Sequence, residues 1–215
     1  LYVSVFSETS FSSGDPAGFI LRFNTTTGAY RVVAQNDGDG IPEAGEIDLH
    51  NPEGLVFDPS GRIYVTSNRT NPTTGIEENT SIVVVDPATG LQVDRITLTP
   101  STRPDNPTRI FAQAILFGPE DKLYIPITET SLSDGLSSGG IWTYDPVVHR
   151  TSAFVIPSLF DPPLTFPYYL TFGQTDSATL RYVAGGTVEP PVLSKLETTP
   201  LLIEGAVTAG IPRDI

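Results

Sequence analysis

Apolar and polar residues alternate with a period of two over much of the chain, the pattern of β-strands that bury one face. In one stretch this alternation, together with a β-branched run, predicts four consecutive short strands. They are expected at residues 54–58, 62–67, 81–86 and 92–98. No segment shows a clear 3.6-residue period of an amphipathic helix. The pattern therefore predicts an all-β chain.

The strand pattern recurs along the chain at an offset of about sixty residues. The segment GLVFDPSGRIYVTS (54–67) aligns with AILFGPEDKLYIPI (114–127), and IVVVDPATG (82–90) aligns with IWTYDPVVH (141–149). A weaker copy covers residues 169–186. Such a repeat predicts successive units of four strands each, in which every unit contacts its neighbours.

Each unit is expected to join its last two strands through a turn that begins with Asn or Asp. Asn24, Asp86 and Asp145 occupy this position in three successive units. The side-chain oxygen of such a residue can accept a hydrogen bond from the backbone amide two residues further along. We interpret these three residues as structural rather than catalytic.

The segment NPEGLVFDPSGRIYVTS (51–67) resembles the repeat of the NHL-type and gluconolactonase-like β-propellers. The resemblance implies a β-propeller of four-stranded blades that repeat about every 60 residues, in one domain over residues 1–215. The blades are expected at approximately 1–35, 52–98, 111–157 and 167–215. About three and a half to four blades would fit, so an incomplete ring is expected. Because the chain also lacks methionine, we expect it to be a piece of a longer product.

The amino-acid composition limits what the chain can be expected to bind. The chain has 12 Lys and Arg against 25 Asp and Glu, a net charge of −13, which argues against binding nucleic acid or an anionic membrane. It has no cysteine, so disulfides and thiolate metal sites are excluded. No apolar run is long enough to span a membrane. We expect a secreted or cell-surface protein, glycosylated at the sequons of Asn24, Asn68 and Asn79.

The crossover between the first two units, QNDGDGIPEAGEIDLH (35–50), is rich in acidic residues and glycine. A calcium loop of the EF-hand type needs oxygen ligands at positions 1, 3, 5, 7, 9 and 12, with glycine at position 6. Placing Gly40 at position 6 leaves Gln35 at position 1. The remaining ligands are then the side chains of Asp37, Asp39, Glu43 and Glu46 and the carbonyl of Ile41. The stretch also resembles the DGDGIPD segments of thrombospondin type 3 repeats, and the alternative is a solvated polar loop.

Gluconolactonase-like propellers hold a divalent metal in their pore through Glu and Asn or Asp side chains. The resemblance therefore implies Glu53 and Asn51 as candidate catalytic residues, with His50 alongside and Gln113 near the corresponding place in the next unit. The alternative is that HNPEG is only the turn that leads into a strand. A further segment, 159–169, is rich in proline and aromatic residues and is expected to be a covering loop.

Three functions remain open at this point. The first is a non-enzymatic extracellular binding or scaffold module, stabilised by Ca²⁺ at residues 37–48, whose partner is a protein or a carbohydrate. The second is a divalent-metal-dependent lactonase or hydrolase that acts in the propeller pore. The third is a surface-assembly subunit that associates with copies of itself through open sheet edges.

Overall fold

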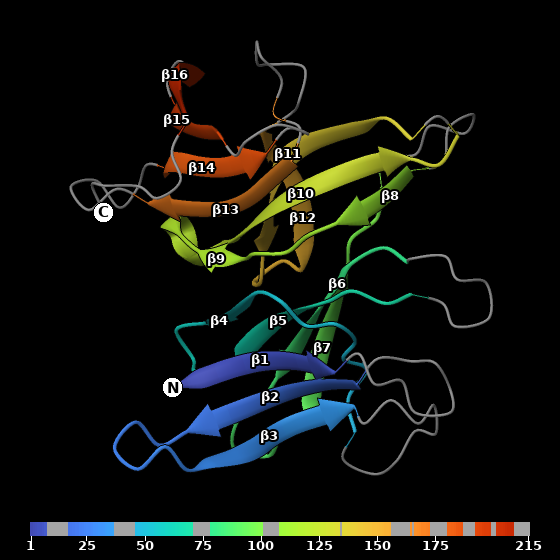
Figure 1. The fold of residues 1–215 in the computed structure, drawn as a ribbon, viewed down its shortest axis with the longest axis vertical. Coiled ribbons are helices and arrows are strands. Elements are labelled where there is room, and N and C mark those ends of the chain that lie inside the picture. Colours follow the sequence, from blue (N-terminus) through green and yellow to red (C-terminus); the bar gives the residue numbers. More distant parts are fainter. Residues whose placement is uncertain are drawn as a thin grey trace. The chain divides into compact units, whose positions relative to one another are not determined.

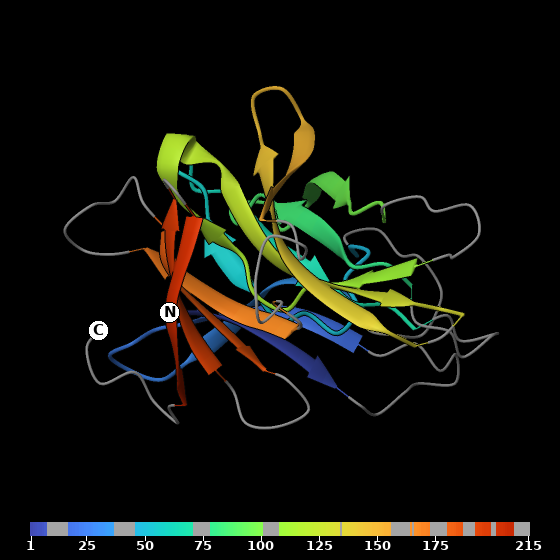
Figure 2. The same cartoon turned by 90° about the horizontal axis from the view of Figure 1, so that it is seen from above.

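The chain is all-β. The computed structural model describes residues 1–7, 17–36, 46–70, 78–100, 108–133, 135–155, 164, 166–172, 180–186, 192–198 and 201–208. These residues form sixteen β-strands and one short 3-10 helix, with no α-helix among them. The strands make four antiparallel sheets, none of which closes on itself (Figures 1 and 2). The chain divides into two compact units, Leu1–Thr99 and Pro100–Ile215.

The first unit contains two sheets. The first sheet has the order β1-β2-β3 and the second has the order β4-β5-β6-β7 (Figure 1). Their strands are β1 (Tyr2–Ser7), β2 (Ala17–Phe23), β3 (Tyr30–Asn36), β4 (Leu55–Phe57), β5 (Ile63–Ser67), β6 (Ser81–Val85) and β7 (Gln92–Thr97). The four strands expected between residues 54 and 98 are therefore confirmed, each within one residue at either end.

The second unit also contains two sheets. In the third sheet the strands are β8 (Thr108–Phe111), β9 (Leu116–Phe117), β10 (Leu123–Ser131), β11 (Ser137–Asp145) and β12 (Arg150–Val155), with the 3-10 helix η1 (Pro119–Asp121) before β10. In the fourth sheet they are β13 (Phe166–Phe172), β14 (Leu180–Gly186), β15 (Val192–Thr198) and β16 (Leu201–Thr208). Each sheet follows the chain in order, except that β8 and β9 both pair with β10.

Pro126 explains why two short strands share one edge of β10. The strand β9 pairs with Leu123 and Tyr124, whereas β8 pairs from Thr128 onward. Proline has no amide hydrogen to donate, so it is tolerated where one side of a strand needs no ladder partner. The break between the two partners falls at this proline.

The expectation of a covering loop over residues 159–169 is wrong at its end. From Phe166 onward the chain is strand β13, which pairs with β14. Pro167 is compatible with this pairing because β13 is an edge strand and the register shifts directly after the proline. Residues 159–163 and 165 lie outside the described residues.

The predicted Asx turns are confirmed in three sheets. Asn24, Asp86 and Asp145 each accept a hydrogen bond at 2.9 Å from the backbone amide two residues further along. In the first two turns a glycine four residues after the Asx residue, Gly28 or Gly90, has a left-handed backbone with φ of 73° or 76°. The sequence repeat is therefore a repeat of the same hydrogen bonds.

A second repeated turn joins β4 to β5 in the second sheet and β9 to β10 in the third. The amide of Asp58 donates to the carbonyl of Arg62 at 2.9 Å, and sixty residues later Gly118 donates to Lys122 at 3.0 Å. In the first of these turns the Asp58 carboxylate accepts hydrogen bonds from the Ser60 hydroxyl and from both the amide and the guanidinium of Arg62.

The core of the first unit lies between its two sheets. One cluster of buried apolar side chains joins both sheets and the crossover between them. Its members are Ile20, Val33, Ala34, Ile47, Leu49, Ile63, Val65, Val83 and Val85. Every residue of β5 and β6 is buried, so both faces of these strands are covered. This explains why SIVVV is continuously apolar rather than alternating.

The core of the second unit includes an aromatic cluster. The Tyr124 ring meets Phe154 and Phe172 edge to face, with centroids 5.3 and 5.1 Å away. An added Cβ on Gly118 would overlap the Phe172 ring, so the turn before β10 needs glycine for space. The contact ties the third sheet to the fourth, because Phe172 ends β13.

Asp58 generates a prediction about the pH dependence of folding. Burial alone would raise the pKa of its carboxyl, but the hydrogen bonds from Ser60 and Arg62 lower it below the ordinary value. The stabilisation by Asp58 is therefore complete above the pKa of an unfolded aspartate, near 4, and is lost as the pH falls through the folded pKa. We expect Asp58→Asn to lower the free energy of unfolding by about 1–2 kcal/mol at pH 7.

Urea unfolding of the wild type and Asp58→Asn between pH 2.5 and 7 checks this expectation. The difference between the two proteins should be constant above about pH 5 and should shrink below pH 4. Asp86→Asn is the matched control, since asparagine occupies the same turn position at Asn24. A difference for Asp58→Asn that does not change with pH would contradict the assignment.

Candidate functional site

The crossover that leads into β4 is held against the second sheet by backbone hydrogen bonds. The backbone amide of Asn68 donates to the backbone carbonyl of His50 at 2.7 Å, and the backbone amide of Thr66 donates to the carbonyl of Gly54 at 2.9 Å. Between these anchors lies the HNPEG segment of the predicted metal site. The end of β5 therefore fixes its path.

Two hydroxyl side chains of β5 complete this attachment. Thr66 Oγ1 accepts a hydrogen bond from the Gly54 amide at 2.8 Å, and Ser67 Oγ accepts one from the His50 amide at 2.9 Å. Both side chains are buried. Because buried amides need partners, these hydroxyls have a structural role in positioning the crossover.

Asp48 links the side chains of His50 and Arg95 next to the crossover. One oxygen, Oδ1, lies 2.7 Å from His50 Nε2, and the other, Oδ2, makes an ion pair with Arg95 of β7. The Nδ2 atom of Asn36, at the end of β3, lies 3.4 Å from each ring nitrogen of His50. His50 is only 3% exposed. Arg95 is also partly buried, and this burial lowers the pKa of its guanidinium group. The group connects β3, the crossover and β7.

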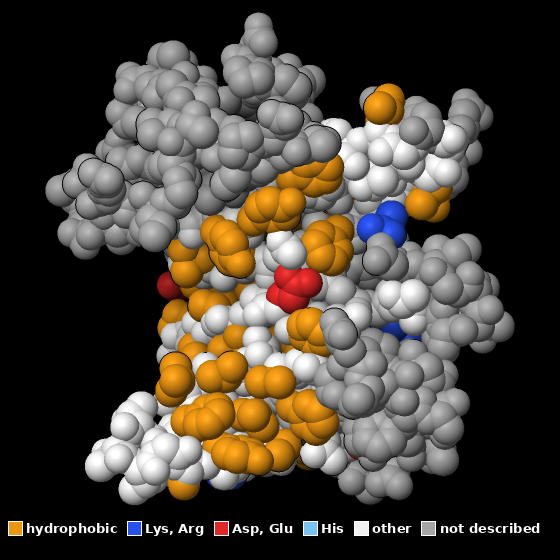
Figure 3. Space-filling model, viewed as in Figure 1, with side chains coloured by type: hydrophobic (Ala, Val, Ile, Leu, Met, Phe, Trp, Pro, Cys, Tyr) orange, Lys and Arg blue, Asp and Glu red, His pale blue; other side chains and the backbone are white. Residues whose placement is uncertain are grey.

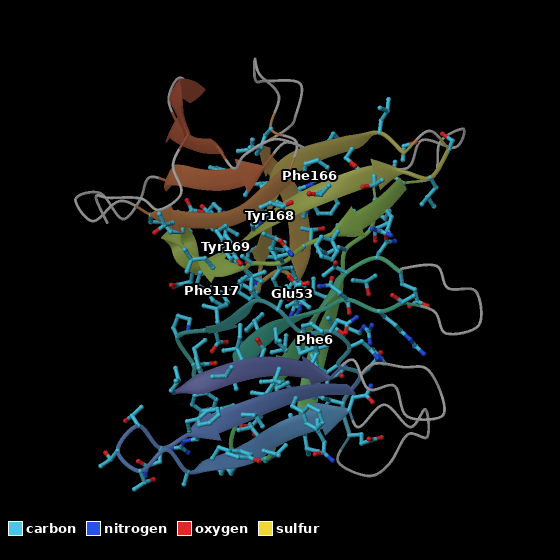
Figure 4. The ribbon with its side chains drawn as sticks, in the orientation of Figure 1. Phe6, Glu53, Phe117, Phe166, Tyr168 and Tyr169 are labelled. Atoms are coloured by element: carbon cyan, nitrogen blue, oxygen red, sulfur yellow. The ribbon has the colours of Figure 1, made fainter. Side chains whose placement is uncertain are left out.

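Glu53 follows His50 by three residues. Its side chain is exposed, and its Oε1 atom lies 3.5 Å from Nδ2 of Asn68. The segment that carries Glu53 runs beside β1, where Ser4 Oγ donates to the Glu53 carbonyl at 2.8 Å (Figure 4). The other candidate, Asn51, has a left-handed backbone with φ of 37°.

The structure thus brings Glu53 to a residue that the sequence did not suggest as its neighbour. Asn68 is fifteen residues away in the chain and buried, and its Oδ1 accepts a hydrogen bond from Thr80. The alignment of β4 with β5 could have indicated this proximity, because both residues lie just outside that pair. Gln113 is half-buried after β8 and belongs to the second unit.

Only the two ends of the predicted calcium loop lie within the described residues. Gln35 and Glu46 form a parallel β-bridge, and the Ile47 amide donates to the Gln35 carbonyl at 3.0 Å. Residues directly opposite each other across such a bridge project their side chains to the same side. The first and last predicted positions are therefore brought together. Four predicted ligands lie outside the described residues: Asp37, Asp39, Ile41 and Glu43.

Within the described ranges no three His, Asp or Glu side chains gather into a group that could hold a metal ion. These ranges exclude most of the acidic loop, residues 37–45, and include the HNPEG segment. There Nδ2 of Asn68 lies 3.5 Å from Oε1 of Glu53, a distance typical of a weak hydrogen bond.

The three sequons differ in exposure. Asn24 is exposed at the tip of the β2–β3 turn, and Asn79 is half-buried just before β6. Asn68 is buried and bonded to both Glu53 and Thr80. A glycan on Asn68 would have to displace these contacts. Glycosylation of this chain stays a prediction, and Asn24 is the most accessible of the three sites.

A shallow cleft of about 500 Å³ opens at one end of the first sheet. The residues that line it include Tyr2, Tyr30, Arg22 and Arg31. The two arginines are directly opposite each other on β2 and β3, and Arg22 lies over the Tyr2 ring at 5.8 Å. Arginine and aromatic rings together suit an acidic or sugar-like group.

No protein-family model matches this chain, and no curated protein sequence matches it. In the part of the chain that the structure describes, no helix is long and apolar enough to cross a membrane. The resemblance to NHL-type repeats therefore rests on the residues of the chain itself.

The geometry predicts that two carboxylates of the crossover contribute differently to the free energy of unfolding. Asp48→Asn removes the charge between His50 and Arg95 and should lower the free energy of unfolding by about 1–2 kcal/mol, a value reduced because Asp48 is 43% exposed. Glu53→Gln should change it by less than about 0.5 kcal/mol, since the Glu53 side chain is exposed. Urea unfolding at pH 7 measures both. Equal losses would show that Glu53 belongs to the structural network.

Proposed function

We propose that the chain is an extracellular, non-enzymatic binding or scaffold protein built as a β-propeller of the NHL or gluconolactonase-like type. We propose further that Ca²⁺ stabilises its first crossover. Under this proposal the sheets are blades, the segment from Gln35 to Glu46 is a metal loop between two of them, and exposed surfaces of the blades bind the partner.

The repeated sheets support the propeller part of the proposal. The second and fourth sheets have four strands each, and each follows the chain order, as blades do. The same Asx turn recurs in the first three sheets, and the same β-turn recurs in the second and third. Strands β5 and β6 are buried along their whole length, as the central strands of a blade are expected to be.

The single observation that carries the calcium proposal is the bridge between Gln35 and Glu46. A twelve-residue loop can surround one ion only if its ends lie close together, and the bridge holds these ends side by side. The enclosed residues contribute three further carboxylates: Asp37, Asp39 and Glu43. Carboxylates confined in so short a loop repel one another, and a divalent cation removes that repulsion.

The binding role is favoured over catalysis by the way the crossover uses its polar groups. The hydroxyls of Thr66 and Ser67 bind backbone amides, and the imidazole of His50 is buried against Asp48. These contacts stabilise the fold and leave Glu53 as the exposed acid of the segment. The cleft at Arg22 and Arg31 offers a place for an acidic or sugar-like group of a protein or carbohydrate partner.

A divalent-metal-dependent lactonase or hydrolase is the second candidate, favoured by the proximity of Glu53 and Asn68. A Glu and an Asn from different strands are the side chains that hold the metal in gluconolactonase-like propellers. An enzyme of this kind would lose lactone turnover in Glu53→Gln while keeping its stability. Turnover that is absent from the wild type, or unchanged in the variant, would exclude this role for Glu53.

Calcium titration tests the main proposal. A site with a dissociation constant near 1 mM raises the free energy of unfolding by about 1.4 kcal/mol in 10 mM Ca²⁺, which shifts the unfolding temperature by about 3–6 °C. We expect this shift for the wild type and for Glu120→Gln, a control at an exposed acid of another turn. We expect its loss in Asp39→Asn and Glu46→Gln.

Isothermal calorimetry with Ca²⁺ under the same conditions gives an independent reading. Heat of binding that saturates for the wild type and disappears in Glu46→Gln supports the site. The calcium proposal would be wrong if the wild type gave no heat and no thermal shift up to 10 mM. It would also be wrong if Glu46→Gln behaved like the wild type.

A further inference from the structure

Two arginines lie side by side in the first sheet, close to the turn between β2 and β3. Arg22 of β2 and Arg31 of β3 are directly opposite each other in the register, so their side chains project from the same face. Both are exposed. Residues in direct register have Cβ atoms about 4.5–5.5 Å apart, so the two guanidinium groups can reach one small ligand. The neighbouring residues Leu21 and Val32 project from the other face, and Figure 3 shows apolar side chains gathered over this sheet.

The charges of this pair are not balanced by a neighbouring acid. Within the described ranges no carboxylate makes an ion pair with Arg22 or Arg31. By contrast, the exposed Arg62 of the second sheet pairs with Asp58 at 2.8 Å. Like charges directly opposite each other in a sheet are destabilising. An anion bound between the two guanidinium groups would remove this repulsion.

The repeated fold does not require arginine at these two positions. The offset of 62 residues between the Asx turns of the first two sheets relates the arginines to Val84 and Val93. In the third sheet the corresponding residues are Thr143 and Ser152, which are again directly opposite each other. The same strands and the same turn therefore form with uncharged side chains. The arginines are peculiar to the first sheet, which favours a role in binding.

Tyr2 of β1 extends this row and holds Arg22 in place. It is directly opposite Arg22 in the register, and Cζ of Arg22 lies 5.8 Å from the centroid of the Tyr2 ring. The ring meets Phe57 edge to face with centroids 4.9 Å apart, and it packs against the apolar core of the first unit. A guanidinium held over a fixed ring has less freedom to lose when a ligand binds. The binding position is thus partly formed in advance.

We propose that Arg22 and Arg31 bind the carboxylate of an acidic sugar, within a glycan whose other sugars are neutral. The proposal rests on the binding role proposed above and names the chemical group that this end of the first sheet accepts. Each guanidinium group has a planar fork of N–H donors that matches the two oxygens of a carboxylate. Two forks on one face hold the carboxylate from two sides.

The surroundings of the arginines favour a sugar with one charge over an acidic peptide. The cleft of about 500 Å³ at this end of the sheet is also lined by Tyr2, Tyr30, Asn24 and Thr25, and its size is that of a small-molecule site. Tyrosine combines an apolar ring with a hydroxyl, and Asn and Thr add hydrogen-bonding groups, which suit the apolar faces and the hydroxyls of a sugar. The net charge of −13 repels a partner with many acidic groups.

NMR titration of the chain with sodium glucuronate, followed at the side-chain N–H groups of arginine, tests the proposal. The chain is produced in bacteria, so that Asn24 at the edge of the cleft carries no glycan. We expect saturable binding by the wild type that Arg31→Gln weakens by about 10-fold or more, because charge-assisted hydrogen bonds are lost. Arg150→Gln is the matched control: it removes the same charge from an exposed arginine of β12 and should bind like the wild type.

Glucose and acetate separate the two parts of the ligand. Glucose lacks the carboxylate and acetate lacks the sugar ring, so each should bind about 10-fold more weakly than glucuronate, or less tightly still. A wild type that binds no glucuronate up to about 50 mM would overturn the proposal, and so would acetate that binds as tightly as glucuronate. Glucuronate binding that Arg31→Gln leaves unchanged would also overturn it, while the binding role of the chain would stand at another surface.

Discussion

The close packing of the first sheet onto the second is the interaction on which the rest of the first unit depends. Ile20 and Ala34 on one side lie in one buried apolar cluster with Val83 and Val85 on the other. The backbones approach so closely that a Cβ on Gly90 would overlap the carbonyl oxygen of Val33. A Cβ on Gly18 would lie 2.5 Å from the carbonyl oxygen of Leu49. Small residues at these two positions are therefore a requirement of the interface.

This packing also determines how the crossover presents its side chains. Ile47 and Leu49 insert into the core between the two sheets, so the residues that alternate with them, Asp48 and His50, form the ion-pair network with Arg95. The same insertion holds the end of the acidic loop at Glu46 beside Gln35. The candidate metal loop and the HNPEG segment are thus positioned by one apolar contact.

Local features of the sequence predict local features of the fold. The bounds of β4 to β7 follow from alternation and from the turn residues, and the Asx turns follow from the chemistry of Asn24, Asp86 and Asp145. Strand β13 overlaps both the blade expected at 167–215 and the loop expected at 159–169, because proline and aromatic residues favour a loop there. An edge strand tolerates that composition, since its outer amides need no ladder partner.

The candidate site was harder to predict because its contacts join distant residues. Resemblance to a pore metal site indicates Glu53 and Asn51, whereas the structure places Glu53 beside Asn68, a residue that the sequence marks only as a sequon. His50 is buried because Leu49 anchors the crossover, a tertiary effect that no local pattern contains.

The most direct test of the packing between the first two sheets is a comparison of two glycines. Gly28 and Gly90 occupy the same position of the same turn with φ of 73° and 76°, but only Gly90 touches the other sheet. Gly28→Ala should lower the free energy of unfolding by about 1 kcal/mol, from backbone strain alone. Gly90→Ala should cost about 2 kcal/mol more in urea unfolding, because its Cβ would push against the Val33 carbonyl. Equal losses for the two variants would contradict the account.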